Sequence, residues 1–174
     1  VFSRNTGDYW MRIRERLGAV LERRNVLHVY PRGGVRDTFE HLFANHLSGP
    51  SEVIAHGIRY GKQDCFGGAP SDRRLQVLVP GRMETRKGAY VLLENLEYIR
   101  LFADVHCLGY GNSMEDLDHH WGITPIQNYE ADQLTTHLEN IRPDLALLLS
   151  TVPETFSYTL SEMSAHGIPS IGNS

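Results

Sequence analysis

The chain has 174 residues, 41% of them hydrophobic and 22% charged, which is an ordinary composition for a globular protein. Its formal net charge of −4 argues against a nucleic-acid partner, because such a partner requires a basic surface. No apolar run approaches the roughly 20 residues of a membrane-spanning helix. The two cysteines, Cys65 and Cys107, form no CxxC pair, so we expect free thiols in a reducing compartment, with Cys107 in the core.

The first seventy residues predict a few short elements between polar turns. We expect helices over 8–24 and 37–47, and strands over 26–30 and 52–55. The first helix carries five arginines: Arg12, Arg14, Arg16, Arg23 and Arg24. Such a basic surface suits either a solvated charged face, which we favour, or contact with anionic lipid. The glycine-rich segment 67–71 is the best candidate for a hinge.

From about Pro70 onward, short apolar runs alternate with amphipathic ones. Strands are predicted over 75–80, 104–108, 123–128, 144–149 and 168–171, and helices over 89–102, 114–121, 131–141 and 155–166. Strands separated by such helices pair in parallel through right-handed crossovers. The sequence therefore predicts a doubly wound, Rossmann-like α/β sheet of order 3-2-1-4-5, with Pro125 marking the third strand as an edge. A sixth strand and a closing helix are missing from this pattern, so we expect a truncated domain.

The ligand site of such a sheet is expected where the strand order reverses, beyond the carboxyl ends of the strands. Here that point lies between the first and fourth strands. The loops that leave these two strands are residues 81–88 and 150–154, and both are chemically distinctive.

The first loop combines a glycine with several cations. Gly81 allows a sharp turn off the strand, Arg82 can contact phosphate oxygens in bidentate fashion, and Lys87 adds a second positive charge. Two cations that converge on one cleft suit a diphosphate. The alternative is a solvated loop in which these cations, with Arg86, bind nothing, and the loop alone does not decide between the two.

The second loop runs directly into a predicted helix, whose free N–H groups and positive dipole end attract an anion. Glu154 and Glu162 are eight residues apart, about two turns plus 80°, so they do not stack on one helix face. Glu154 must therefore lie at or before the helix start, facing the cleft mouth, where a carboxylate can accept hydrogen bonds from sugar hydroxyls. By spacing alone we favour the alternative, in which Glu154 only complements the helix N-terminus and Glu162 lies on the surface.

Three motifs in this order resemble a known family. They are GR with KG over 81–88, PETFSYTLSE over 153–162, and GIP over 167–169. The combination resembles the C-terminal, donor-binding domain of the family-4 group of retaining glycosyltransferases, which have the GT-B fold. The match covers about residues 51–174, and HGI at 56–58 resembles the segment where the family's chain leaves its first domain.

The resemblance implies a role for each matching position. Arg82 and Lys87 would hold the diphosphate of a UDP- or GDP-sugar and stabilise the leaving group, Glu154 would contact the donor sugar, and Glu162 would bind the ribose. The implied catalytic residues are Arg82, Lys87 and Glu154. Backbone amides over 156–159 would contact phosphate, and the resemblance implies no metal or other cofactor. The implied donor-binding set is Gly81, Arg82, Lys87, Glu154, Phe156, Ser157, Tyr158, Thr159 and Glu162.

Two departures accompany the resemblance. Ser157 stands where the family usually has glycine. The resemblance starts near residue 51, so we expect these 174 residues to include almost nothing of the family's N-terminal domain, which supplies the acceptor site. We interpret residues 1–70 as the trailing part of that domain with a linker, and residues 71–174 as the nucleotide-sugar-binding domain. The fragment alone should bind UDP or GDP weakly and transfer little or no sugar.

The resemblance also suggests a setting and leaves other functions open. It implies a saccharide or lipid-linked acceptor and a role in polysaccharide biosynthesis. It also implies a cytoplasmic location with peripheral contact to the inner membrane face. A sugar-nucleotide epimerase of the same fold and a non-catalytic nucleotide-sugar-binding module are the alternatives. Asp116 and His120 could form a metal pair on a helix, but an exposed helix surface is the better explanation for the acidic and histidine residues near them.

Overall fold

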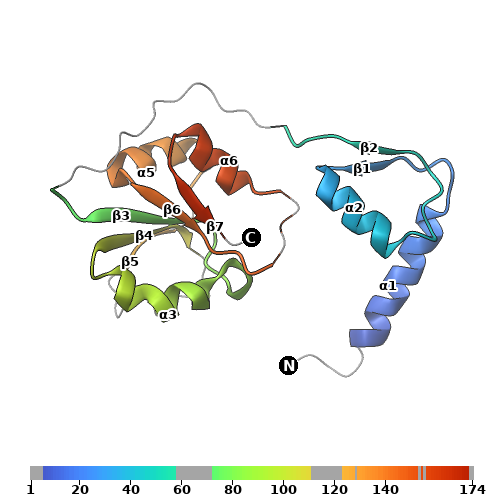
Figure 1. Ribbon diagram of the computed structural model, residues 1–174, viewed down its shortest axis with the longest axis horizontal. Helices are drawn as coiled ribbons and strands as arrows, with labels where there is room; N and C mark the ends of the chain where they lie inside the picture. The colour runs from blue at the N-terminus through green and yellow to red at the C-terminus, as the bar shows by residue number, and fades with distance from the viewer. Residues whose placement is uncertain are drawn as a thin grey trace. The chain divides into compact units, whose positions relative to one another are not determined.

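A computed structural model describes residues 6–57, 72–110, 123–127, 129–152, 154 and 156–172 (Figure 1). The chain divides into two compact units, Val1–Gly57 and Ile58–Ser174. The expected hinge at 67–71, the expected helix at 114–121, Cys65, and the pair Asp116 and His120 lie outside the described residues. The interpretation of the first unit as the end of an N-terminal domain stays a prediction.

The first unit has the predicted order of two helices and two strands. Its elements are α1 (Thr6–Leu21), β1 (His28–Tyr30), α2 (Gly33–Leu42) and β2 (Ser51–Val53). The two strands pair in parallel, as expected for strands joined through a helix. The helix α2 begins four residues before the predicted start and ends five residues before the predicted end, because Phe43 already leaves helical geometry.

The helix α1 presents an apolar stripe to solvent. Tyr9, Trp10, Ile13, Leu17 and Val20 are all exposed, and they recur at the spacing of one helix face. Within residues 6–57, the buried side chains are those of Leu21, His28 and Tyr30. This unit therefore has very little hydrophobic core of its own.

The second unit contains a five-stranded parallel sheet in the predicted order. Its strands are β3 (Leu75–Pro80), β4 (Ala103–Tyr110), β5 (Ile123–Gln127), β6 (Leu145–Leu148) and β7 (Ser170–Gly172). They lie side by side as β5-β4-β3-β6-β7, which is the predicted order 3-2-1-4-5. The strand that contains Pro125 is at the edge, as its missing N–H requires.

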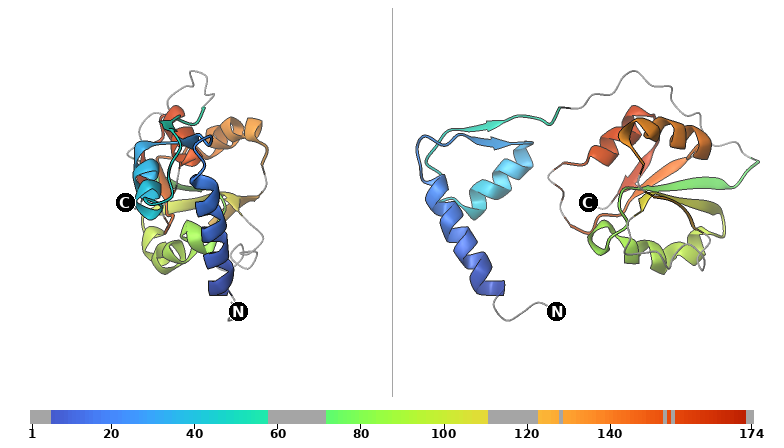
Figure 2. Two further views of the ribbon diagram at one scale, coloured as in Figure 1. Left: turned by 90° about the vertical axis from the view of Figure 1, so that its right-hand side faces the viewer. Right: turned by 180° about the vertical axis from the view of Figure 1, so that it is seen from behind.

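Helices cover both faces of this sheet (Figures 1 and 2). The helix α3 (Ala89–Ile99) packs on one face, while α5 (Leu134–Ile141) and α6 (Tyr158–Ala165) pack on the other. Apolar side chains of β3 point alternately into the two layers: Val79 joins Leu92 and Cys107 on the α3 side, and Leu78 joins Met163 on the α6 side. The doubly wound α/β prediction is therefore correct, and Cys107 is buried in the core, as predicted.

Helix boundaries differ from the predictions in two instructive places. The helix expected over 131–141 begins with a short 3₁₀ turn, Ala131–Gln133, in which Glu130 and Gln133 form a reciprocal capping box. The helix expected from 155 begins at Tyr158, because the side chain of Ser157 accepts a hydrogen bond from the Leu160 N–H and caps the helix there. The interval between Leu148, where β6 ends, and Tyr158, where α6 begins, is thus longer than predicted.

Two arginines form ion pairs and hydrogen bonds at the amino-terminal edge of the sheet. The guanidinium of Arg73 forms a bidentate pair with the buried carboxylate of Asp144, at 2.7 and 2.8 Å. Asp144 also accepts a hydrogen bond from the Gln76 N–H at 2.8 Å. Arg74 donates to the carbonyls of Arg100 and Ala103, beside the end of α3. The cations at this edge therefore have structural partners within the sheet.

Candidate functional site

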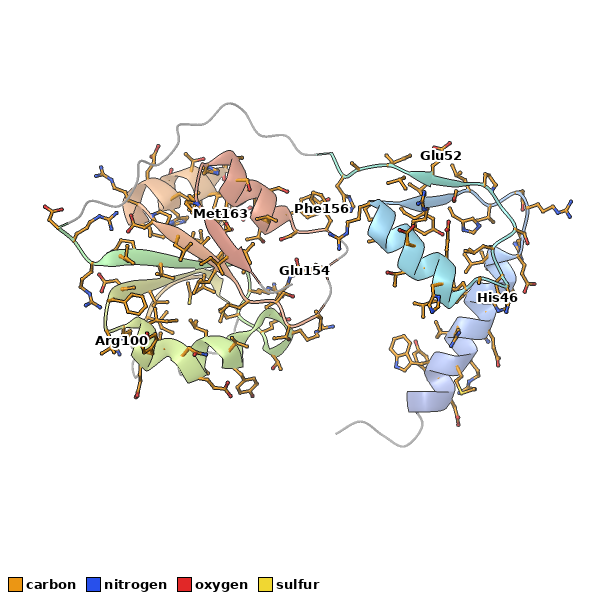
Figure 3. The ribbon with its side chains drawn as sticks, in the orientation of Figure 1. His46, Glu52, Arg100, Glu154, Phe156 and Met163 are labelled. Carbon is orange, nitrogen blue, oxygen red and sulfur yellow. The ribbon has the colours of Figure 1, made fainter. Side chains whose placement is uncertain are left out.

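The two loops singled out by the sequence lie in direct contact at the carboxyl edge of the sheet. The Lys87 Nζ forms an ion pair and hydrogen bond with Glu154 Oε1. A backbone bond reinforces the contact, because the Thr151 N–H donates to the Arg86 carbonyl at 2.9 Å. Figure 3 labels Glu154 on the segment that leads from β6 toward α6. The geometric requirement for a shared site is therefore met.

Glycines shape the first loop at both ends. Gly81 has a φ of 95°, and its N–H donates to the Leu108 carbonyl at 2.7 Å, so the chain turns sharply off β3 while it remains tied to β4. Gly88 has a φ of 83°, and a β-carbon there would collide with the carbonyl oxygen of Leu149. Glycine at this position therefore lets α3 start directly beside the end of β6.

Between these glycines, the side chain of Met83 is buried, and the other side chains are half-buried or exposed. Met83 is buried against α3 and anchors the loop. The neighbouring Arg82 extends outward, with 71% of its side chain exposed, and has Glu84 at 3.8 Å as a loose ionic neighbour. An exposed pair of this kind contributes at most about 1 kcal/mol, so the guanidinium can exchange Glu84 for a stronger anionic partner at little cost.

Glu154 lies in a polar environment that keeps it ionised. Only 25% of its side chain is exposed, and burial alone would raise the pKa of its carboxyl group. The hydrogen bond and charge of Lys87, together with smaller contributions from Ser150 and Ser157, outweigh burial, so the net pKa of Glu154 is lowered. At neutral pH the group is therefore a carboxylate that can accept hydrogen bonds.

The first turn of α6 lies beside the start of the first loop. A β-carbon built on Gly81 would have Thr159 Oγ1 as its neighbour, at 3.9 Å. Phe156, which Figure 3 labels, packs edge to face on Tyr158, the first residue of α6, with ring centroids 4.8 Å apart. The helix N-terminus, with its partial positive charge, is thus at the same edge as Arg82 and Lys87.

Glu162 lies one turn further along α6 and is half-buried. Its neighbour Tyr129 was not identified from the sequence. Burial raises the pKa of the Tyr129 hydroxyl, and the negative charge of Glu162 raises it further. A β-carbon on Gly109 would meet the Tyr129 ring at 3.4 Å and Gly81 at the same distance, so this ring borders the site. Tyr129 follows a predicted edge strand and so lies at the carboxyl edge of a parallel sheet. This position in the sequence pattern could have identified it.

The structure therefore brings together most of the predicted site. Gly81, Lys87, Glu154, Ser157 and Thr159 are linked by the contacts above. Arg82, Phe156 and Tyr158 lie on the same two segments, and Glu162 continues the same helix. Glu154 contacts Lys87 directly, a contact that the spacing argument did not address. The roles of these residues toward a ligand stay predictions.

Solved structures with a similar fold include a galactosyltransferase and a two-protein complex. The lipopolysaccharide outer core galactosyltransferase WaaB, in its apo form, matches with a TM-score of 0.64 and 16% sequence identity, over 84% of this chain and 42% of that one. The GtfA/B complex matches with a TM-score of 0.56 and 18% identity, over 98% of this chain and 33% of that one. No protein-family model matches the sequence, and no curated protein matches it.

These likenesses establish the class of fold. The second unit is a parallel α/β domain of the Rossmann-like type found in GT-B glycosyltransferases. The chain spans less than half the length of either similar structure. Among the helices that the structure describes, none has both the length and the apolar character needed to cross a membrane.

Proposed function

We propose that this chain supplies the donor-binding half of a retaining glycosyltransferase of the family-4 type, which transfers a hexose from a UDP- or GDP-sugar. The contact between Lys87 and Glu154 carries the proposal, because it joins the two loops that the motif requires at one site. The GT-B fold of the similar structures supports it.

In this proposal, charged groups at the carboxyl edge of the sheet bind different parts of the nucleotide sugar. Arg82 and Lys87 bind the diphosphate from one loop, and the N-terminus of α6 faces it from the other. Negative charge that develops on the leaving diphosphate is met by these fixed donors, so the chemistry needs no metal ion. Glu154 accepts hydrogen bonds from the sugar, and Glu162 from the ribose.

Binding would bring a second anion to the pair between Lys87 and Glu154. A diphosphate that reaches Lys87 also brings negative charge toward the Glu154 carboxylate. Lys87 can stay between the two anions, since an ammonium group has three donors. Neutralising the carboxylate, as in Glu154→Gln, should therefore leave the affinity for UDP unchanged or raise it, while Lys87→Ala should lower it.

The remaining parts of the proposal concern the whole enzyme. Acceptor binding and full activity would depend on a complete N-terminal domain, so the present chain alone should transfer little sugar. Saccharide or lipid-linked acceptors, and a role in polysaccharide biosynthesis at the cytoplasmic membrane face, belong to the same proposal. The exposed apolar stripe of α1, with arginines on the same helix, supports peripheral contact with anionic lipid.

Calorimetric titration with UDP, GDP and ADP tests the proposal. We expect weak, saturable binding of UDP or GDP, lost in Arg82→Ala and in Lys87→Ala. Arg100→Ala is the matched control, because it removes the same charge at the far end of α3 (Figure 3). Unchanged affinity in both site variants would overturn the assignment of the site.

A further inference from the structure

His166 is a buried histidine at the carboxyl end of α6, and the proposed function gives it no role. The residue is 2% exposed. It directly follows the last helical residue, and its backbone N–H donates to the Glu162 carbonyl at 3.2 Å. The helix α5 packs on the same face of the sheet as α6 (Figure 1). Because the imidazole ring is enclosed, its two nitrogens need hydrogen-bond partners.

Both ring nitrogens have partners, and these partners define the tautomer. Nδ1 lies 2.8 Å from the carbonyl oxygen of Glu162, and Nε2 lies 3.3 Å from the hydroxyl oxygen of Thr135. A carbonyl oxygen can only accept, so Nδ1 carries the proton and donates it. In the neutral ring Nε2 is then an acceptor, and the Thr135 hydroxyl donates to it. The hydrogen bonds therefore run in one direction, from Thr135 through the ring to Glu162.

These hydrogen bonds join two helices at the turn that contains Glu162. Thr135 lies in the first turn of α5, whereas Glu162 and His166 belong to α6 and its carboxyl end. Apolar contacts among Leu138, Met163 and their neighbours also hold the two helices on the sheet, but such contacts have no preferred direction. A buried hydrogen bond restricts both distance and angle. The link through the ring therefore opposes rotation or sliding of α6 against α5.

We propose that His166 is a positioning residue, which, as the Nδ1–H tautomer, fixes the backbone of Glu162 relative to α5. Its meaning for a ligand rests on the proposed function, in which Glu162 binds the ribose. A shift of this backbone would then weaken the ribose contact more than the diphosphate contacts, because Arg82 and Lys87 belong to a different segment. The link itself is a property of the free chain, so it can be measured without any ligand.

Nitrogen-15 NMR of the imidazole rings in the 174-residue chain tests the link directly, with His166→Gln used for assignment. At neutral pH we expect a protonated Nδ1 and an unprotonated Nε2 for His166, the tautomer that free histidine adopts less often. Thr135→Val removes the hydroxyl but keeps the shape of the side chain, so it should shift the Nε2 signal and leave Nδ1 protonated. Thr135→Ser should leave both signals in place. A protonated Nε2 in the wild type, or an Nε2 signal that ignores Thr135→Val, would overturn the inference.

The second measurement is the preference for UDP over 2′-deoxy-UDP, and for GDP over 2′-deoxy-GDP, by calorimetry. The deoxy analogues lack a ribose hydroxyl, so the ratio of the two affinities reports the contact assigned to Glu162. A general loss of folded protein lowers both affinities equally and cancels in the ratio. We expect His166→Ala to lower the ratio about threefold or more, and Thr135→Val to lower it less. Thr135→Ser, which keeps the hydroxyl, should preserve the ratio.

A double variant distinguishes one link from two independent effects. If Thr135 acts through the ring, Thr135→Val should have no further effect in a chain that already carries His166→Ala. An added loss in the double variant, or a wild-type ratio in His166→Ala, would contradict the positioning role. If the wild-type chain bound none of the four nucleotides, the proposed function would fail, while the nitrogen-15 measurement would still decide on the link between His166 and Thr135.

Discussion

The two units of the chain differ in how they are held together. The second unit has a five-stranded sheet with a hydrophobic cluster on each face, built from residues that are almost completely buried. The first unit has two strands of three residues each, and the apolar stripe of its longest helix faces solvent. A small sheet of this kind is at best marginally stable by itself. The second unit should therefore carry nearly all of the measurable folding cooperativity.

Removing a central side chain of the second unit should give the largest effect. Leu78 is fully buried in β3, so Leu78→Ala should lower the free energy of unfolding by about 2–5 kcal/mol. Leu17→Ala in α1 removes the same atoms from an exposed position, and it should change that free energy by at most about 0.5 kcal/mol. Urea denaturation followed by circular dichroism measures both. Comparable losses would show that α1 is packed in the folded chain.

Two glycines provide a second comparison between the units. Gly88 has a positive φ and touches the backbone of Leu149, so Gly88→Ala should destabilise the second unit by roughly 1–2 kcal/mol from the left-handed geometry alone, with the collision added. Gly33 begins α2 with open space around it, and Gly33→Ala should be neutral or stabilising by up to about 1 kcal/mol. Differential scanning calorimetry of both variants gives the two shifts in Tm. A neutral Gly88→Ala would contradict the close approach of α3 to β6.

One ion pair in each unit provides a third comparison, with smaller expected changes in the free energy of unfolding. The Asp144 carboxylate is buried and bonds both Arg73 and the Gln76 N–H, so Asp144→Ala should cost about 1.5–3 kcal/mol. In the first unit, Asp37 forms an exposed pair with Arg36, and Asp37→Ala should cost less than about 1 kcal/mol. Equilibrium urea unfolding at two salt concentrations distinguishes the pairs, because only the exposed one should respond strongly to salt.

The pair between Lys87 and Glu154 should give the smallest effect, visible as a dependence on pH. The pKa of Glu154 is lower in the folded chain than its ordinary value, so the folded state binds fewer protons there than the unfolded state. The pair therefore stabilises the chain above about pH 4.3, and this stabilisation is lost as the pH falls through the folded value. The stability of Lys87→Met should vary less between pH 5 and pH 3 than that of the wild type. Identical slopes would mean that the pair is absent in solution.

The fold was largely predictable from sequence because its signals are local. Continuous apolar runs such as 75–80 and 144–149, separated by amphipathic helices, indicate buried parallel strands, and parallel crossovers then limit the order of the sheet. Pro125 indicated the edge strand through the absence of one N–H. The start of α6 was less accessible, because it depends on whether the side chain of Ser157 turns back to cap the helix.

The sequence motifs proposed the residues of the candidate site but could not predict the contacts between them. The motif identified Lys87 and Glu154, but their ion pair depends on how closely α3 approaches the end of β6, which the Gly88 backbone permits. Tyr129 was missed for a similar reason. Its proximity to Glu162 depends on how β5 and α6 come together in space, and no sequence spacing reports that.

The central claim is that the two loops at the carboxyl edge of the sheet bind one diphosphate together. Backbone amide NMR of the 174-residue chain during titration with UDP and GDP tests it most directly. One of the two nucleotides should shift amides in residues 81–88 and in residues 156–160 with the same saturation curve, and inorganic pyrophosphate should compete. Shifts confined to one loop, or to the opposite sheet edge around Arg74, would contradict the claim.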